Sequence, residues 1–263
     1  MNLKRAVYAL ATVFFLNFAC AADLKEVDAI AQTLAPSGEL KVGVYLGSPT
    51  SMVMDAQTGK VHGVAVELGR SLADAIHRPV RLVQFDRVAQ VIEALKNGQV
   101  DMTFTNATAV RAKEVDFTAP LIRLELGVLV PVASNVKQFM DVNDPSFRLG
   151  VAKGSSSQSV LGTKLNFTNI VPVDSLEQAQ HMLTSGELNG FATNKGILFQ
   201  LNERLQGFKV LEDRWGLESL AIAIPKGRDQ ARPFLTEFAK QQLETGAIAA
   251  DANRAGLRGM AKD

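Results

Sequence analysis

The sequence has very little of what disulfide, metal and most catalytic chemistry requires. Its 263 residues include one cysteine, Cys20, and three histidines, His62, His77 and His181, which lie far apart in the chain. One cysteine cannot form an intramolecular disulfide, and the scattered histidines form no recognisable metal motif or Ser/His/Asp arrangement. We therefore expect no catalytic residues, no metal site and no cofactor.

The chain also lacks an excess of charge and a second long apolar run. It has 28 basic and 27 acidic residues, a formal net charge of +1, so a nucleic-acid partner has no electrostatic support. After the N-terminal segment, no apolar run reaches the about 18 residues that suggest a membrane helix. With 47% hydrophobic and 21% charged residues, the composition predicts a soluble globular protein of one large or two smaller domains.

The first 21 residues have the pattern of a secretory signal peptide. Lys4 and Arg5 give it a positive start, and residues 6–19 are almost wholly apolar but short for a membrane span. Small residues at 19–21 offer an A-x-A cleavage site. Cleavage after Ala21 removes both basic residues and changes the net charge from +1 to −1. We expect export to the periplasm.

Cys20 leaves one alternative open at this end of the chain. It would be the lipidated first residue if the segment were a lipoprotein signal, although Asn17 stands where such signals usually have leucine. Anchoring through Cys20 is therefore the less favoured alternative.

Strand and helix patterns alternate in the first half of the chain. Strands are expected at 40–46, 79–85 and 100–104, and helices at 63–76 and 88–95. This order predicts a parallel sheet with right-handed crossovers, which binds ligands at the carboxyl ends of its strands. The stretch TNATAVRAKEVDFT, residues 105–118, follows the third strand at such an end. Arg111 within it is therefore a candidate binding residue.

The alternation restarts near residue 147 and predicts a second α/β unit. Strands are expected at 147–152, 169–173 and 188–193, and helices after the turn KGSSSQS, from a cap at Asp174 to Leu183, and at 195–205. The runs 126–132 and 219–225 are expected to cross between the units, and the helices from Gln230 onward to return to the first.

Several motifs along the chain occur in an order that resembles one protein family. They are LKVGVY, GKVHGVAVELGRSLADAI, ALKNGQVDMTF, TAVRAKEVDFTAPL, LGVAKGSSS and IAIPKG. Over residues 38–257 the chain resembles the family 3 extracytoplasmic solute-binding proteins that serve amino-acid ABC transporters. The resemblance implies an α/β, two-lobed periplasmic-binding-protein fold of type II, in which two mixed sheets flanked by helices are joined by two hinge strands.

The resemblance also implies the domain boundaries and the partners. Residues 1–21 are then the signal peptide, 22–126 plus 220–263 form lobe 1, and 127–219 form lobe 2. We expect a monomer that closes on a small carboxylate-bearing solute and delivers it to the transmembrane permease subunits of an ABC importer. A sensing module that feeds a signalling partner is the alternative, and a periplasmic dehydratase-type enzyme is less favoured.

Arg111 is the central residue of the site that the resemblance implies. In the family, its position binds the solute's carboxylate, and a planar, permanently charged guanidinium suits that role. The resemblance or the local pattern adds Tyr45, Ser48, Phe104, Asn106, Thr108, Ser155, Ser156 and Asn194 as ligand-binding residues. The structural alternative is that Arg111 only pairs with Glu114 or Asp116 at the surface.

The family's ammonium site is where this sequence departs from the pattern. Asn194 stands where the family has an aspartate, and Ser48 where it has a stacking aromatic residue. Burying an ammonium without a counter-charge costs several kcal/mol. We therefore expect a small carboxylate-bearing solute that need not be an α-amino acid, unless another acid, such as Glu67 or Asp86, enters the cleft.

Overall fold

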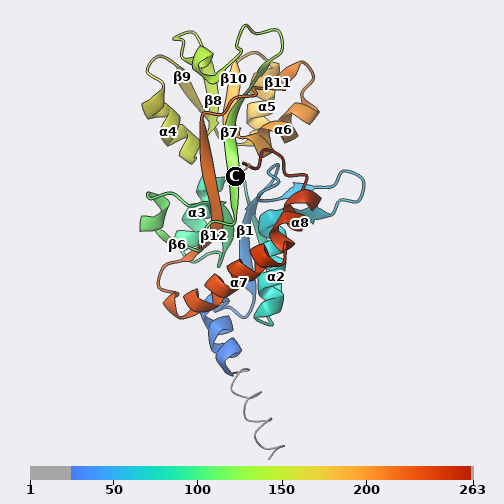
Figure 1. Ribbon diagram of the computed structural model, residues 1–263, viewed down its shortest axis with the longest axis vertical. Helices are drawn as coiled ribbons and strands as arrows, with labels where there is room; N and C mark the ends of the chain where they lie inside the picture. The colour runs from blue at the N-terminus through green and yellow to red at the C-terminus, as the bar shows by residue number, and fades with distance from the viewer. Residues whose placement is uncertain (1–24, 262–263) are drawn as a thin grey trace, which may run out of the picture.

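The computed structural model describes residues 25–261, so the predicted signal peptide and Cys20 lie outside the described residues. Two groups of elements are stacked along the long axis of the molecule, and β7 (Ile122–Pro131) and β12 (Gly216–Pro225) run from one group to the other (Figure 1). Within residues 25–261, no helix combines the length and the apolar character that crossing a bilayer requires.

The lower group is built on a parallel strand pair. Its elements begin with a helix at 25–34 and continue as β1 (Leu40–Tyr45), β2 (Val53–Met54), β3 (Val61–His62), α2 (Val64–Ala75), β4 (Val80–Phe85), α3 (Val88–Lys96), β5 (Thr103–Asn106), η1 (Arg111–Lys113) and β6 (Val115–Phe117). β1 pairs in parallel with β4, and a parallel bridge joins Val42 of β1 to Met102, just before β5. The predicted alternation and parallel pairing between residues 40 and 104 are confirmed.

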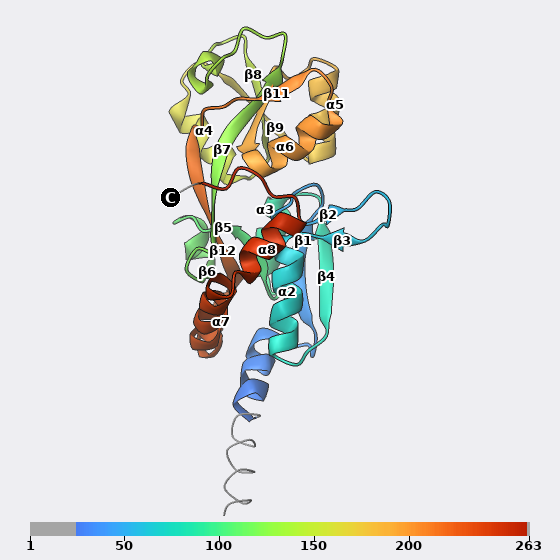
Figure 2. The same ribbon diagram turned by 45° about the vertical axis from the view of Figure 1, so that its right-hand side comes forward.

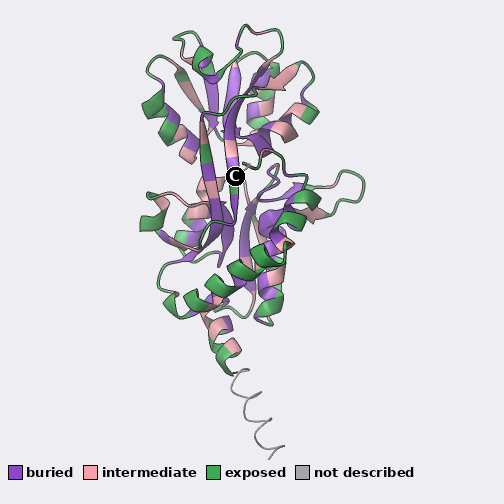
Figure 3. Ribbon diagram, in the orientation of Figure 1, coloured by how far each residue is buried: buried purple, intermediate pink, exposed green. Residues whose placement is uncertain are grey.

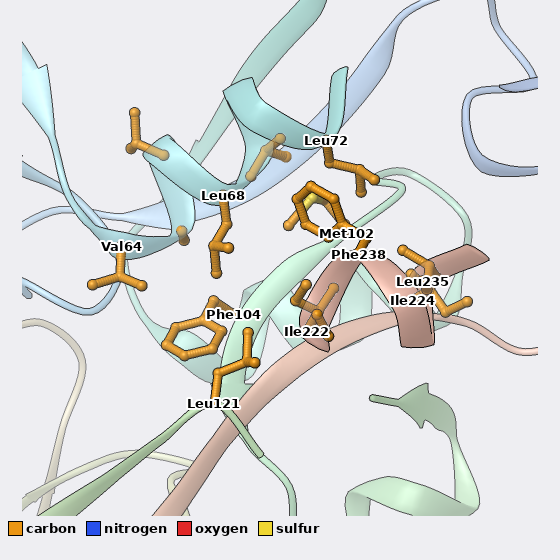
Figure 4. Packing of buried hydrophobic residues seen from close by; sticks show 14 of the residues in the cluster. Val64, Leu68, Leu72, Met102, Phe104, Leu121, Ile222, Ile224, Leu235 and Phe238 are labelled. Carbon is orange, nitrogen blue, oxygen red and sulfur yellow. The ribbon is translucent and has the colours of Figure 1, made fainter. Parts of the chain in front are cut away.

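The C-terminal helices complete the core of the lower group. α8 (Ala247–Arg254) lies beside α2, and α7 (Arg232–Glu244) packs on α8 (Figure 2), so the C-terminal helices return to this group, as predicted. Phe238 of α7 packs with Leu72 of α2, Met102 and Ile222 of β12 (Figure 4). The chain then runs back beside β7, where Met260 forms an antiparallel β-bridge with Leu124 of that strand.

The upper group contains the second alternation of strands and helices. Its elements are η2 (Phe139–Val142), β8 (Arg148–Ala152), α4 (Ser156–Lys164), β9 (Asn169–Val173), α5 (Leu176–Thr184), β10 (Gly190–Asn194), α6 (Lys195–Arg204) and β11 (Phe208–Val210). One detail of the prediction is wrong: Ser175, not Asp174, caps α5, and its side chain accepts a hydrogen bond from the Gln178 N–H. The Asp174 carboxylate instead forms ion pairs with Arg87 and Lys153.

The two groups share one eight-stranded sheet but have separate cores. The strand order is β5-β12-β7-β10-β8-β9, with β6 on β12 and β11 on β7. The largest lower core draws its buried residues from 31–124 and 220–257, whereas the two upper cores draw theirs from 126–215. Figure 3 shows the inner strands buried in both groups and the outer helix faces exposed.

β7 and β12 are the crossing strands, but they begin earlier than predicted. β7 starts at Ile122 rather than at 126, and β12 at Gly216 rather than at 219, and the two pair antiparallel from Gly216↔Leu126 to Leu220↔Ile122. The longer β12 includes Glu218, a residue that the predicted strand left out.

Candidate functional site

A cleft of about 640 Å³, partly open to solvent, lies where the two groups meet. Residues from both groups and from β12 line it. The predicted ligand-binding residues that the structure brings together there are Tyr45, Phe104, Asn106, Arg111, Ser155, Ser156 and Asn194. The two others, Ser48 and Thr108, are not among the lining residues.

Arg111 is held rigidly at the end of β5. Its Nη1 donates to Thr105 Oγ1 at 2.9 Å and to the Asn106 carbonyl at 3.2 Å, and its backbone N–H donates to Thr108 Oγ1 at 3.2 Å. Among the described residues, its side chain makes no further hydrogen bond, so Nε and Nη2 keep their donors for a ligand. Thr108 therefore acts on the backbone that carries Arg111 rather than on the cleft.

The surface ion pairs considered for Arg111 are formed by other residues. Glu114 pairs with Lys96 at 2.9 Å, and Asp116 pairs with Lys226 at 3.0 Å. Burial lowers the pKa of the Arg111 guanidinium, while Glu218 and Tyr45 act in the opposite direction. A guanidinium stays charged in proteins, so Arg111 is a fixed cation at the cleft.

The register of β5 against β12 decides where the backbone of β5 points. In the ladder, Thr105 lies opposite Ala221 and Phe104 lies opposite Ile222. The N–H and C=O of Ile222 bond to Thr118 and not to Phe104. In an antiparallel ladder such alternation turns the Phe104 carbonyl away from β12. On that side, the Tyr45 N–H bonds to Ser51 Oγ, so β1 does not continue the ladder there.

Asn106 spans the cleft between the two groups. Its Oδ1 accepts from the Ser219 N–H at 3.1 Å, which orients the amide, and its Nδ2 donates to Ser156 Oγ at 3.2 Å. Ser156 is the first residue of α4. The amide donor of Asn106, a predicted ligand-binding residue, thus faces α4 in this structure.

The N-terminus of α4 forms the wall opposite Arg111. Ser155 is its cap, and the Ser155 side chain accepts from the Gln158 N–H at 3.2 Å. The first backbone N–H groups of a helix have no partner within that helix, so those of Ser156 and Ser157 are free for an anion. Ser157, which the sequence reasoning missed, also lines the cleft.

Tyr45 and Ser48 form a hydrogen-bonded group behind the cleft surface. The Tyr45 hydroxyl donates to Ser48 Oγ at 3.3 Å, and Ser48 Oγ lies 2.9 Å from Thr50 Oγ1. Ser48 has no exposed surface. Burial raises the pKa of the Tyr45 hydroxyl, so Tyr45 is a neutral group at the edge of the cleft, and Ser48 supports it.

Asn194 closes β10 and begins α6. It is 5% exposed, and its Oδ1 accepts from the Ile197 N–H at 3.0 Å as the helix cap. With Oδ1 engaged in this way, the amide group that remains is a donor. Asn194 is thus poorly suited to accept a bond from a ligand ammonium, the role that the family gives to aspartate at this position.

Glu218 is a buried acid of the cleft that the sequence reasoning also missed. It lies on β12, is 7% exposed, and lines the cleft. Its Oε1 is buried without a hydrogen-bond partner. Burial raises the pKa of Glu218 to about 7, although Arg111 and the nearby Asn194 amide favour the anion. The Asn194 amide stabilises this charge from nearby, but no hydrogen bond of ordinary length and angle joins the two side chains.

The two acids considered from the sequence behave differently from Glu218. Glu67 pairs with Arg70 at 2.8 Å and is not a lining residue. Asp86 does line the cleft, but it is exposed and accepts from Gln90 Nε2. Within the described residues, no group of three or more His, Cys, Asp or Glu side chains is placed to hold a metal ion.

Comparisons with known proteins find relatives among the amino-acid-binding proteins. The Geobacillus stearothermophilus glutamine-binding protein is 24% identical over 193 residues, which are 72% of this chain and 73% of that protein. A Streptococcus pneumoniae amino-acid ABC transporter substrate-binding protein bound to L-arginine superposes with a TM-score of 0.77 and 18% identity, covering 89% of this chain and 99% of that one.

A third protein has the same fold and carries a different amino acid. It is a binding component of an ABC transporter from Wolinella succinogenes complexed with lysine, with a TM-score of 0.73, 22% identity, and coverage of 82% of this chain and 95% of that one. The predicted α/β fold of the periplasmic binding proteins is therefore confirmed at the level of the architecture.

The family model that matches the sequence covers most of the described chain. It spans residues 40–254 and describes binding proteins rather than enzymes, in agreement with the expectation that the protein has no catalytic activity. The chain belongs to family 3 of the bacterial extracellular solute-binding proteins.

Proposed function

We propose that this protein is the periplasmic solute-binding component of an ABC importer, and that it closes two lobes on a small carboxylate-bearing solute, an amino acid or a related organic acid. The observation that carries this proposal is the pair of facing donor sets in the cleft. Arg111 offers Nε and Nη2 from one wall, and the Ser156 and Ser157 N–H groups lie at the other. A carboxylate between them receives a fixed cation and helix-terminal donors together.

The proposed lobes follow the separate cores. Lobe 1 comprises residues 22–126 plus 220–263, lobe 2 comprises 127–219, and β7 and β12 are the hinge strands. Among the described residues, the contacts that join the lobes at the cleft include Asn106 Nδ2 to Ser156 Oγ at 3.2 Å and Arg87 Nη1 to Asp174 Oδ1 at 3.2 Å. Closure on a solute is favourable because only the closed state brings both donor sets to one carboxylate.

The remaining parts of the proposal concern export and delivery. Residues 1–21 act as a signal peptide, and the monomeric binding protein passes its solute to the permease subunits. The family supports an extracytoplasmic location, and the relatives that bind glutamine, arginine and lysine support amino acids as the first class of solute to test.

The experiment that tests this function is a ligand screen on the mature protein. Each α-amino acid and its keto, hydroxy and unsubstituted carboxylic acid is added while the thermal midpoint is measured, followed by calorimetry for every hit. A solute at about 100 times its Kd stabilises the protein by about 2.7 kcal/mol. If no carboxylate of either class shifts the midpoint, the proposed function is wrong.

Arg111→Ala is the variant that tests the site itself. Removing one partner of a buried charge pair costs about 2 to 5 kcal/mol, so we expect binding of the hit to weaken by about 30-fold or more. Arg232→Ala is the matched control, because Arg232 is exposed and pairs only with Asp229 among the described residues. Unchanged affinity in Arg111→Ala would show that the carboxylate binds elsewhere.

A further inference from the structure

Glu218 is placed as a ligand-binding acid rather than as a structural one. It lies on a hinge strand and lines the cleft, and no ion pair neutralises its carboxylate. Oε1 has no hydrogen-bond partner, and no ion pair within 4.0 Å joins Glu218 to Arg111. Buried charged groups in proteins are normally paired, so an unpaired carboxyl that lines a cleft indicates a missing cationic partner.

The charges that face Glu218 identify where such a partner comes from. Arg111 faces it from the end of β5, Tyr45 from β1, and the Asn194 amide from the end of β10. Arg111 is the only cation among these groups, and its free donors also face the cleft. Arg87 also lines the cleft, but its guanidinium is paired with Asp174. A solute with a carboxylate alone would therefore bring a second anion to Arg111 and Glu218, whereas a zwitterion balances both of these protein charges.

We propose that Glu218 binds the ammonium group of the solute, so that the solute is a zwitterionic amino acid with its carboxylate at Arg111. This inference rests on the proposed function and narrows its substrate class. The counter-charge lies on the second hinge strand, β12, rather than at the end of β10. Asn194 caps α6, and its amide lies near the Glu218 carboxylate. It therefore does not act as the acceptor for the ammonium.

Placing the acid on β12 also couples recognition to the hinge. Glu218 lies in the segment of β12 that pairs with β7, and the neighbouring Ser219 N–H orients Asn106, whose amide reaches Ser156 in the other lobe. An ammonium bound by Glu218 therefore sits next to the backbone that connects the lobes. Ligands without that group make no contact of this kind with the hinge.

The test compares matched pairs of ligands by calorimetry on the wild-type protein at pH 8. The probes are L-glutamine, L-arginine, L-lysine and L-alanine, each against the same molecule without its α-amino group. We expect at least one amino acid to bind about 100-fold more tightly than its des-amino partner. Equal or tighter binding of the des-amino acids overturns the inference while leaving the proposed function intact. If neither set binds, the proposed function fails and the inference fails with it.

Two isosteric variants locate the ammonium site. Glu218→Gln is expected to lose the preference for the amino acid, so that each pair binds within about threefold, while the des-amino acids bind no more weakly than to wild type. Glu114→Gln makes the same charge change outside the cleft and is expected to keep the preference. If Glu218→Gln keeps it and Asp86→Asn loses it, Asp86 is the ammonium site and the inference is wrong. The wild-type comparison of matched pairs decides the question even if Glu218→Gln fails to fold.

Discussion

Arg111 and Glu218 are two oppositely charged residues that line the cleft, and the protein supports them very differently. Arg111 is fixed by Thr105 Oγ1, the Asn106 carbonyl and a backbone bond to Thr108. Glu218 has an unpartnered oxygen and a pKa raised to about 7. The guanidinium of Arg111 is positioned by the protein itself, whereas the carboxylate of Glu218 carries a desolvation penalty that a cationic ligand group can offset.

The difference teaches why the two charges contribute differently to folding and binding. Arg111 is stabilised by contacts within the protein, so a ligand adds further hydrogen bonds to a guanidinium that is already held in place. Glu218 opposes folding when it is ionised and gains its partner only when a cation arrives. Unpaired buried charges are common at functional sites, where they lower the stability of the folded protein but favour ligand binding.

The largest expected change in the stability of the folded protein comes from neutralising Glu218. A raised pKa means that the folded state favours the protonated acid. The associated stability is present below the ordinary pKa of 4.5 and is lost as the pH rises through about 7. At about 1.4 kcal/mol per pKa unit, Glu218→Gln should stabilise the empty protein at pH 8 by up to about 3 kcal/mol. The thermal midpoint should rise by roughly 2 to 4 °C per kcal/mol.

The control for this prediction is the same pair of proteins at pH 4. At that pH, below the ordinary pKa of 4.5, most of the wild-type acid is protonated in both the folded and the unfolded state, so the two midpoints should nearly agree. A variant that is less stable than wild type at pH 8 would show that Glu218 makes stabilising contacts in the empty cleft.

Moving the acid from β12 to β10, where the family has it, tests whether its position matters as well as its charge. In Glu218→Gln with Asn194→Asp, the new carboxylate can still cap α6, because aspartate and asparagine are comparable caps. We expect amino-acid affinity to recover by about tenfold or more relative to Glu218→Gln alone, since an opposite charge returns to the ammonium. Calorimetry measures it, and no recovery would mean that the position on β12 matters as much as the charge.

The pH dependence of binding to the wild-type protein follows from the same acid. With a pKa of about 7 in the empty cleft, Glu218 must release its proton before it pairs with an ammonium. Amino-acid affinity should therefore fall by up to about tenfold for each pH unit below 7 and level off above 8. Glu218→Gln should show no such slope. A wild-type affinity that is flat between pH 6 and 8 would contradict the raised pKa.

The smallest expected effect concerns the contact between the two walls. Arg87 pairs with Asp174 across the cleft, but the Asp174 side chain is 59% exposed. Exposed ion pairs contribute about 0 to 1 kcal/mol, so Asp174→Asn should weaken solute binding by no more than about fivefold. Titration in 0.5 M salt provides the control, because screening should remove most of the difference. If Asp174→Asn lost as much solute affinity as Arg111→Ala, this ion pair would be a main contribution to closure of the lobes.

The sequence predicted most of the strand and helix order because the periodicities are local. Residues 169–173 form a strand with the predicted bounds, and α3 begins at the predicted Val88. Arg111 was identified because a motif and the carboxyl end of a strand both point to it. The choice of cap for α5 failed because Asp174 and Ser175 are both good caps, and only the backbone geometry selects Ser175.

Glu218 was missed for a reason that the strand itself explains. The predicted strand started at Ser219, although alternation places Glu218 on the same face as Leu220, Ile222 and Ile224, which are all buried. Extending the strand by one residue would have included the acid and pointed it inward. The sequence carries no local sign, however, that this inward face opens into a cleft at Glu218.

Local patterns alone determined the family, the order of elements, the anchoring of Arg111 after β5 and the serine-rich start of α4. They could do so because turns, caps and apolar spacing act over a few residues. Only the tertiary structure decided that Glu218 lies unpaired in the cleft, that Asn194 is engaged as a helix cap, and that Ser48 is buried behind Tyr45. These outcomes depend on segments far apart in the chain, since burial and the absence of a partner are properties of the assembled surfaces.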